Sequence, residues 1–142
     1  MMKKELQYFS LDEFEKASSD KVPNQYLDNA YEILSILDVI RHHYGHPLVI
    51  LAGGGYRNAD FNEKLDGAKS SRHLIAQAMD VRPLKSNNFG EIKVIKALTE
   101  KLLAEKLLKT ESHLGIGIYD RCEKSFIHID CRKGQKARWE GK

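Results

Sequence analysis

Two histidines and one aspartate in this sequence are spaced like the ligands of a metal ion. His73 and Asp80 lie seven residues apart among small residues, and His128 lies far downstream in the middle of an apolar run. A catalytic zinc ion takes three nitrogen or oxygen ligands at roughly 2.0–2.2 Å and keeps a fourth position open for water. Two imidazoles and one carboxylate meet that need. By spacing alone, His73 also fits a loop histidine, and His128 a core histidine bonded to a backbone carbonyl.

The elements that must position these residues can be predicted from turn signals and apolar spacing. Ser10 and Glu13 form the pattern of a capping box, which predicts a short helix after Ser10. A long amphipathic helix should follow Pro23 and end near Gly45 and Pro47. Two further helices are predicted, a short one over 58–65 and a long one over 88–108. Strands are predicted over 48–51, 77–81, 114–119 and 125–130, the last two as a hairpin.

This order of elements predicts an α+β fold with a small, mainly antiparallel sheet flanked by helices. No repeat, low-complexity segment or linker divides the sequence, so residues 1–142 are expected to form one domain. Side chains alternate between the two faces of a strand. We therefore expect Phe126, His128 and Asp130 to share one face, and Cys131 to point away from it.

Composition excludes several classes of function. The net charge of +3 comes from Lys and Arg interleaved with Asp and Glu, which does not indicate a nucleic-acid-binding protein. No run of about eighteen apolar residues is present for insertion into a membrane. The basic N-terminus lacks the apolar segment of a secretory signal, so no signal peptide is expected. The two cysteines, Cys122 and Cys131, make no disulfide framework, which favours a reducing compartment.

Several motifs, in order along nearly the whole chain, resemble the zinc D-Ala-D-Ala carboxypeptidase and murein endopeptidase family, whose fold is shared with the hedgehog signalling domain. The family signature Ser-x-His-x-x-Gly-x-Ala-x-Asp is matched at Ser71, His73, Ala78 and Asp80. The run from Phe126 to Asp130 is similar to the Phe-Val-His-Val-Asp strand of one branch. Other similar segments are 8–14, Gly55-Tyr56-Arg57, Gly117-Ile118-Tyr119 and Arg138-Trp139.

The sequence departs from the family at two positions. Ala76 stands where the signature has Gly, and Gly54 stands where the family has Ser before Gly-Tyr-Arg. Glycine often serves where the backbone needs unusual torsions or a close approach. Alanine is the mildest replacement, so we expect the backbone path to be preserved at Ala76.

The resemblance implies a hedgehog/DD-peptidase-like fold and a zinc ion (Zn2+) held by His73, Asp80 and His128. It implies metal-assisted hydrolysis, in which the metal acidifies a water molecule and polarises the scissile carbonyl. The substrates implied are the stem peptides of peptidoglycan.

The resemblance also implies roles in substrate binding for three residues. Arg57 would bind a substrate carboxylate, which matches the fork of a guanidinium; a surface ion pair with Asp60 or Asp66 is the alternative. Ser71 either hydrogen-bonds the substrate or holds the His73 loop. Tyr119 either donates to a developing oxyanion or serves in packing.

The general base is the least determined part of the predicted site. In several branches of the family it lies two or three residues before the last ligand histidine, and here those positions are Phe126 and Ser125, which cannot act as bases. Asp130 is the nearest candidate; it is the base, a partner that orients a ligand imidazole, or part of an unrelated salt bridge. His113 is a second candidate, with an exposed strand end as the alternative.

The sequence therefore predicts a monomeric zinc metallopeptidase that cuts D-amino-acid-containing bonds, as a carboxypeptidase or as an endopeptidase. One alternative is a catalytically inactive zinc-containing module that binds the cell wall or serves as a structural part. Another is a metal-free structural or partner-binding domain. Because no signal peptide is expected, a phage-derived lysin or phage structural protein, made in the cytoplasm and delivered to the cell wall, is the hypothesis for its location.

Overall fold

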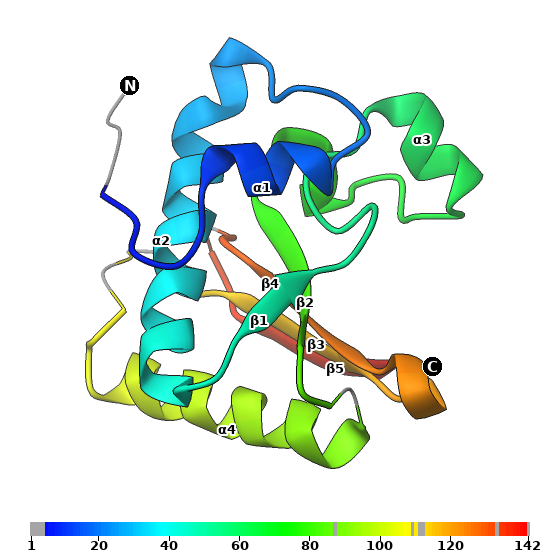
Figure 1. Ribbon diagram of the computed structural model, residues 1–142. Helices are drawn as coiled ribbons and strands as arrows, with labels where there is room; N and C mark the ends of the chain where they lie inside the picture. The colour runs from blue at the N-terminus through cyan, green and yellow to red at the C-terminus, as the bar shows by residue number, and fades with distance from the viewer. Residues whose placement is uncertain (1–4, 87, 109, 111–112, 133, 142) are drawn as a thin grey trace.

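A five-stranded sheet with the strand order β1-β2-β4-β3-β5 lies at the centre of the computed structural model (Figure 1). The model describes residues 5–86, 88–108, 110, 113–132 and 134–141. The strands are β1 (Leu48–Ile50), β2 (Ala78–Pro83), β3 (Gly115–Tyr119), β4 (Phe126–Asp130) and β5 (Ala137–Gly141). The pairs β1–β2, β2–β4 and β3–β4 are antiparallel, whereas β5 pairs in parallel with β3. The predicted α+β fold and mainly antiparallel sheet are confirmed, and β5, which we did not predict, makes the sheet mixed.

Four α-helices accompany the sheet in the described part of the chain: α1 (Leu11–Lys16), α2 (Leu27–Tyr44), α3 (Ala59–Lys64) and α4 (Phe89–Ala104). The Ser10 hydroxyl accepts a hydrogen bond from the Glu13 backbone N–H, as the capping box predicts. Gly45 ends α2 at φ 82°, a left-handed conformation that suits glycine. Helix α4 ends four residues before the predicted position, because the Leu107 N–H reaches back to the Leu102 carbonyl and reverses the chain.

The two long helices, α2 and α4, contact each other and pack against one face of the sheet. That face of the hairpin carries Ile116, Ile118, Ile127 and Ile129, which are all buried in the core. The other face of β4 carries Phe126, His128 and Asp130, in agreement with the predicted alternation. No helix in the described ranges is both long and apolar enough to cross a membrane.

The strand register aligns one row of residues across this second face. Asp80 on β2 lies opposite His128 on β4, and Gly117 on β3 lies opposite both His128 and Trp139. A Cβ atom at Gly117 would lie only 2.3 Å from the Trp139 indole. Glycine at 117 therefore leaves room for the indole to lie beside the His128 ring, at 5.3 Å between ring centroids.

Candidate metal centre

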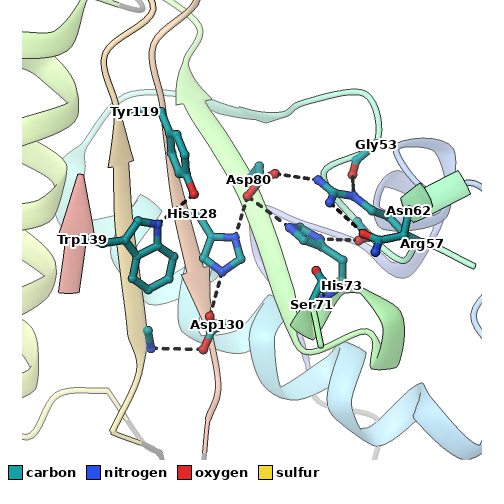
Figure 2. A network of polar contacts seen from close by, with 12 residues as sticks. Gly53, Arg57, Asn62, Ser71, His73, Asp80, Tyr119, His128, Asp130 and Trp139 are labelled. Atoms are coloured by element: carbon teal, nitrogen blue, oxygen red, sulfur yellow. Dashed lines mark hydrogen bonds and ion pairs between the residues drawn. The ribbon is translucent and has the colours of Figure 1, made fainter. Parts of the chain in front are cut away.

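Figure 2 shows His73, Asp80 and His128 converging on one point, and one side-chain atom of each lies within 4.8 Å of the others. The Asp80 Oδ1 atom is 3.3 Å from His73 Nε2 and 2.9 Å from His128 Nδ1. Ligand atoms that each lie about 2.0–2.2 Å from a tetrahedral zinc ion are about 3.4 Å from one another. All three side chains are buried, with 2%, 6% and 9% of the residue surface exposed, respectively. The predicted ligands are therefore brought together with a spacing that suits a small metal ion.

The chain fixes which nitrogen each histidine offers. His73 Nδ1 lies 2.8 Å from the Gly55 carbonyl oxygen, which can only accept, so Nδ1 carries the proton and Nε2 presents a lone pair. His128 Nε2 lies 2.7 Å from Asp130 Oδ2, so a neutral His128 places its proton there and its lone pair on Nδ1. Both lone pairs face the same oxygen of Asp80. Three acceptors in this arrangement need a shared cation or an added proton between them.

A short 3₁₀ helix, Arg72–Ile75, carries His73 into the site, and this element was not predicted. The Ser71 hydroxyl accepts from the His73 backbone N–H at 3.2 Å, which is the loop-holding role considered for Ser71. Ala76 ends the helix at φ 59°, ψ 31°, the left-handed region where the family has Gly. The backbone path is thus preserved with alanine, at a cost of about 1–2 kcal/mol for a residue with a Cβ atom.

The position of Asp80 is fixed from the backbone and from the side chain. Its backbone N–H donates to the Gly54 carbonyl at 3.0 Å, and a Cβ atom at Gly54 would lie 2.9 Å from the Asp80 carbonyl oxygen. The family serine therefore could not replace Gly54 without a local shift of the chain. The Asp80 Oδ2 atom accepts from Arg57 at 3.3 Å, which turns Oδ1 toward the histidines.

Arg57 is held by several groups at once. Its Nε donates to the Gly53 carbonyl at 2.7 Å, and its Nη1 donates to Asn62 Oδ1 at 3.3 Å, in addition to the contact with Asp80. Only 14% of the side chain is exposed, so Arg57 is not a surface arginine paired with Asp60 or Asp66. Two of its five N–H groups have no partner among these contacts, and Arg57 lines the cavity beside the metal centre.

Asp130 lies behind His128, on the side of the ring away from Asp80 and His73. Its carboxylate is fully buried and accepts from His128 Nε2, the Gly115 backbone N–H and two N–H groups of Arg132. A carboxylate engaged in this way is placed to orient the imidazole, which was one of the three alternatives for Asp130, and its ion pair with Arg132 belongs to the same arrangement. The geometry disfavours Asp130 as the general base, because a base would have to reach a water molecule on the cavity side of the trio.

His113, the second base candidate, is not brought into the site. It is exposed two residues before β3, and its backbone N–H donates to the Arg132 carbonyl. It lies four residues before Gly117, the partner of His128, which corresponds to about 13 Å along a strand. His113 does not line the cavity, and this placement disfavours it as the general base.

Tyr119 lines the cavity and contacts Trp139. The Trp139 Nε1–H donates to the Tyr119 hydroxyl at 2.8 Å. An indole N–H can only donate, so the Tyr119 oxygen accepts and keeps its own proton to give to a third group. The Tyr119 ring also stacks on Phe126, with 4.6 Å between centroids and 7° between planes. Packing and hydrogen-bond donation are thus compatible roles for this residue.

Sequence reasoning missed three groups that support the trio: the Gly55 carbonyl, Arg132 and Trp139. Arg132 could have been found, because it lies two residues after Asp130 and the period of a strand continues the same face. The Gly55 carbonyl and the Trp139 indole reach the site from segments that only the tertiary fold brings close. Arg138, which precedes Trp139 in the family-like segment, pairs with Glu100 at 2.8 Å.

The charges of the site shift its pKa values strongly before any metal binds. Burial alone would raise the pKa of Asp80, but His73 and His128 hold it well below its usual range. Burial alone would lower the pKa of His128, but the hydrogen bonds and charges of Asp130 and Asp80 raise it to about 9. Arg132 and His128 likewise hold the pKa of Asp130 well below its ordinary value, against the effect of burial. His128 therefore holds its proton more tightly than an ordinary histidine, and a bound metal ion would displace that proton.

We expect the metal-free protein to lose stability as the pH rises from about 6.5 to about 9. The folded pKa of His128 lies above its ordinary value of 6.5, so the imidazolium stabilises the fold fully below pH 6.5 and no longer above pH 9. The loss should be on the order of 3 kcal/mol in the free energy of unfolding. Urea unfolding in the presence of a chelator at several pH values measures it. His128→Gln should flatten this part of the profile, and an unchanged slope in that variant would contradict the assignment.

Asp130→Asn should weaken metal binding by about 10–100-fold, because the imidazole loses the carboxylate that orients it. Competition with a chromogenic chelator measures the affinity. Glu100→Gln is the matched control, since it also removes the carboxylate of an arginine pair, with Arg138, but at a place away from the trio. Equal metal affinities for Asp130→Asn and Glu100→Gln would show that Asp130 does not position His128.

Comparison with known proteins agrees with this geometry. The family model described as Peptidase M15 matches residues 7–130. The match covers most of the chain, so the protein belongs to the peptidase M15 family, as the resemblance to the zinc D-Ala-D-Ala carboxypeptidases predicted. Peptidases of this family are metal-dependent, so the chain is, at this level, a metallopeptidase acting on peptide substrates. A comparison with curated proteins finds no match.

Proposed function

We propose that this chain is a zinc-dependent peptidase that hydrolyses D-amino-acid-containing peptide bonds in the stem peptides of peptidoglycan. The observation that carries the proposal is the meeting of His73 Nε2, His128 Nδ1 and Asp80 Oδ1 on the wall of a cavity of about 590 Å³. That volume falls in the range of sites that bind small molecules and short peptides. Family membership supports the choice of a peptide as substrate.

The donor set supports zinc as the metal. Two neutral imidazoles and one carboxylate are ligands that zinc binds in catalytic sites, whereas Mg²⁺ and Ca²⁺ prefer sites made of oxygen atoms. The two histidines already present lone pairs rather than protons to the centre, through Gly55 and Asp130. When bound, zinc would polarise the scissile carbonyl and lower the pKa of a water molecule.

The chain itself would position the substrate and stabilise developing charge. Tyr119 would donate its free proton to the carbonyl oxygen of the scissile bond as negative charge develops there. Arg57 would keep Asp80 oriented and offer its remaining N–H groups to a substrate carboxylate. Ser71 would hold the backbone of His73 from the rim of the cavity.

Hydrolysis also needs a group that accepts a proton from the attacking water molecule. Asp80 and Asp130 are both engaged in the contacts described above, and His113 lies at an exposed strand end. Of the described carboxylates that line the cavity, the third belongs to Asp66, in the exposed loop after α3. This favours a second candidate function, a zinc-containing module that binds the cell wall or serves as a structural part without cutting it.

Hydrolysis of defined muropeptides distinguishes the two functions. Zinc-loaded protein would be incubated with stem peptides offered as carboxypeptidase and as endopeptidase substrates, with and without a chelator, and the products identified by mass spectrometry. The proposal expects products only without the chelator. Stoichiometric zinc without any product from the whole panel would favour the binding module, and a protein that holds no zinc would exclude both.

We further propose that the protein reaches the cell wall by a phage route, as a lysin or as part of a phage particle. The support is that the proposed substrate, peptidoglycan, lies outside the cytoplasm, so a protein that cuts it needs a route to the cell wall. A gene located beside lysis or tail genes would support this route, and a gene located among host cell-wall genes would contradict it.

A further inference from the structure

Four arginines line the cavity, and two of them form ion pairs with carboxylates of the metal centre. Arg57 bonds to Asp80, and Arg132 bonds to Asp130 through two N–H groups. Each of these guanidinium groups therefore neutralises a carboxylate that belongs to the site. The other two are Arg72 and Arg121.

Arg121 is held in place by aromatic rings rather than by a carboxylate. Its guanidinium carbon lies 5.4 Å from the centre of the Tyr119 ring and 5.2 Å from the centre of the Phe126 ring. These two rings stack on each other and form one platform. Both distances are within the range of a cation–π contact, which orients an arginine without consuming its N–H groups. Among the side chains that the structure describes, which leave out that of Glu123, no carboxylate forms an ion pair with Arg121.

The platform lies about two residues along β4 from the trio. Phe126 and His128 lie on the same face of β4, two residues apart, which corresponds to about 7 Å. An extended peptide advances by about the same length over two residues. A substrate with its scissile bond at the trio can therefore place a side chain or terminus two residues away against Arg121.

Arg72 is the competing candidate, because it also lines the cavity and immediately precedes His73. Its backbone carbonyl is used in closing the 3₁₀ helix. No aromatic platform comparable to that of Arg121 orients its guanidinium among the residues that the structure describes. A cation held in one orientation loses less entropy when it binds an anion, which favours Arg121.

We infer that Arg121 is a specificity-determining residue that binds a carboxylate of the substrate located about two residues from the bond that is cut. The inference rests on the proposed function, which makes a peptide bond at the trio the bond that is cut. The ligand chemistry is a peptide that carries a free carboxylate, as a side chain or as its terminus, at this position. A peptide with a carboxamide at the same place should bind more weakly.

Trp139 supplies a measurement of binding that does not need hydrolysis. It is the one tryptophan of the sequence, and it lines the cavity beside His128. Its fluorescence in the full-length, metal-free protein would be followed during titration with tripeptides that differ only in a glutamate or a glutamine, made with L or D residues. We expect the wild type to bind the carboxylate form about tenfold more tightly, as for one charge-assisted hydrogen bond with an exposed arginine.

Arg121→Gln should remove this preference by weakening the carboxylate probe about tenfold and leaving the carboxamide probe within twofold. Arg121→Lys should give an intermediate preference, because it keeps the charge and loses the fork. Arg41→Gln is the matched control, since Arg41 also stacks on a tyrosine, Tyr8, outside the cavity. It should leave both affinities unchanged.

A wild type that binds the two probes equally, or binds neither, would overturn the inference. So would loss of the preference in Arg72→Gln rather than in Arg121→Gln. Hydrolysis assays with zinc are run separately on the same protein. Preference for the carboxylate without hydrolysis would contradict the proposed peptidase activity alone, and hydrolysis without preference would contradict the role of Arg121 alone.

Discussion

His128→Ala should leave a protein that no longer retains a stoichiometric zinc ion and has lost metal-dependent hydrolysis. The substitution removes one of the three converging lone pairs and leaves the Asp130 carboxylate without its imidazole partner. Zinc affinity should fall by more than the roughly 100-fold that the loss of an orienting partner causes. The metal supplies several kcal/mol of charge stabilisation, so hydrolysis should fall by at least about 10³-fold.

Elemental analysis after dialysis measures the zinc content of the variant. The circular dichroism spectrum shows whether the variant is folded, so the two measurements together separate loss of zinc from unfolding. His73→Ala should behave in the same way, since its Nε2 faces the same oxygen of Asp80. His42→Ala is the matched control, because His42 is exposed on α2 and contacts Tyr8 rather than the cavity. A folded His128→Ala protein with one equivalent of tightly bound zinc would disprove the trio.

The sequence could predict the parts of the site that depend on local pattern. Alternation along the strand placed Phe126, His128 and Asp130 on one face before any pairing was known. The hairpin was predictable because two apolar runs flank a short polar segment, and its register follows from that connection. The motif around His73 and Asp80 then suggested the remaining ligands through its resemblance to a family.

Other parts depend on pairing between distant segments, which periodicity does not encode. Asp80 meets His128 because β2 pairs with β4 across 48 residues of sequence. Trp139 enters the site because β5 adds in parallel to β3, a pairing for which the short, half-buried run 137–141 gives no turn signal. The Gly55 carbonyl fixes the His73 tautomer from a loop whose path only the folded chain defines. These contacts decide which nitrogen each candidate ligand offers, so the sequence could suggest the candidate ligands but not their protonation.

Tyr119→Phe should lower kcat by about 10²–10³-fold with little change in KM or in zinc content. The hydroxyl accepts from Trp139 and so keeps its proton for the developing charge of the scissile carbonyl. Removal of one such donor costs this much in other acyl-transfer sites, because the interaction is stronger in the transition state than with the bound substrate. The phenylalanine ring keeps the stack on Phe126, so the loss should not come from unfolding.

Trp139→Phe tests the same hydrogen bond from the other side. It keeps an aromatic ring, smaller than the indole, beside His128 and removes the N–H that directs the Tyr119 hydroxyl, so kcat should fall by a smaller factor, about tenfold. Tyr26→Phe is the matched control, because this tyrosine contacts Tyr56 and does not line the cavity. Steady-state kinetics on one cleaved muropeptide would compare the three variants. An unchanged kcat in Tyr119→Phe would restrict Tyr119 to packing. Stabilisation of the oxyanion would then have to come from the metal and from Arg57, which donates to Asp80.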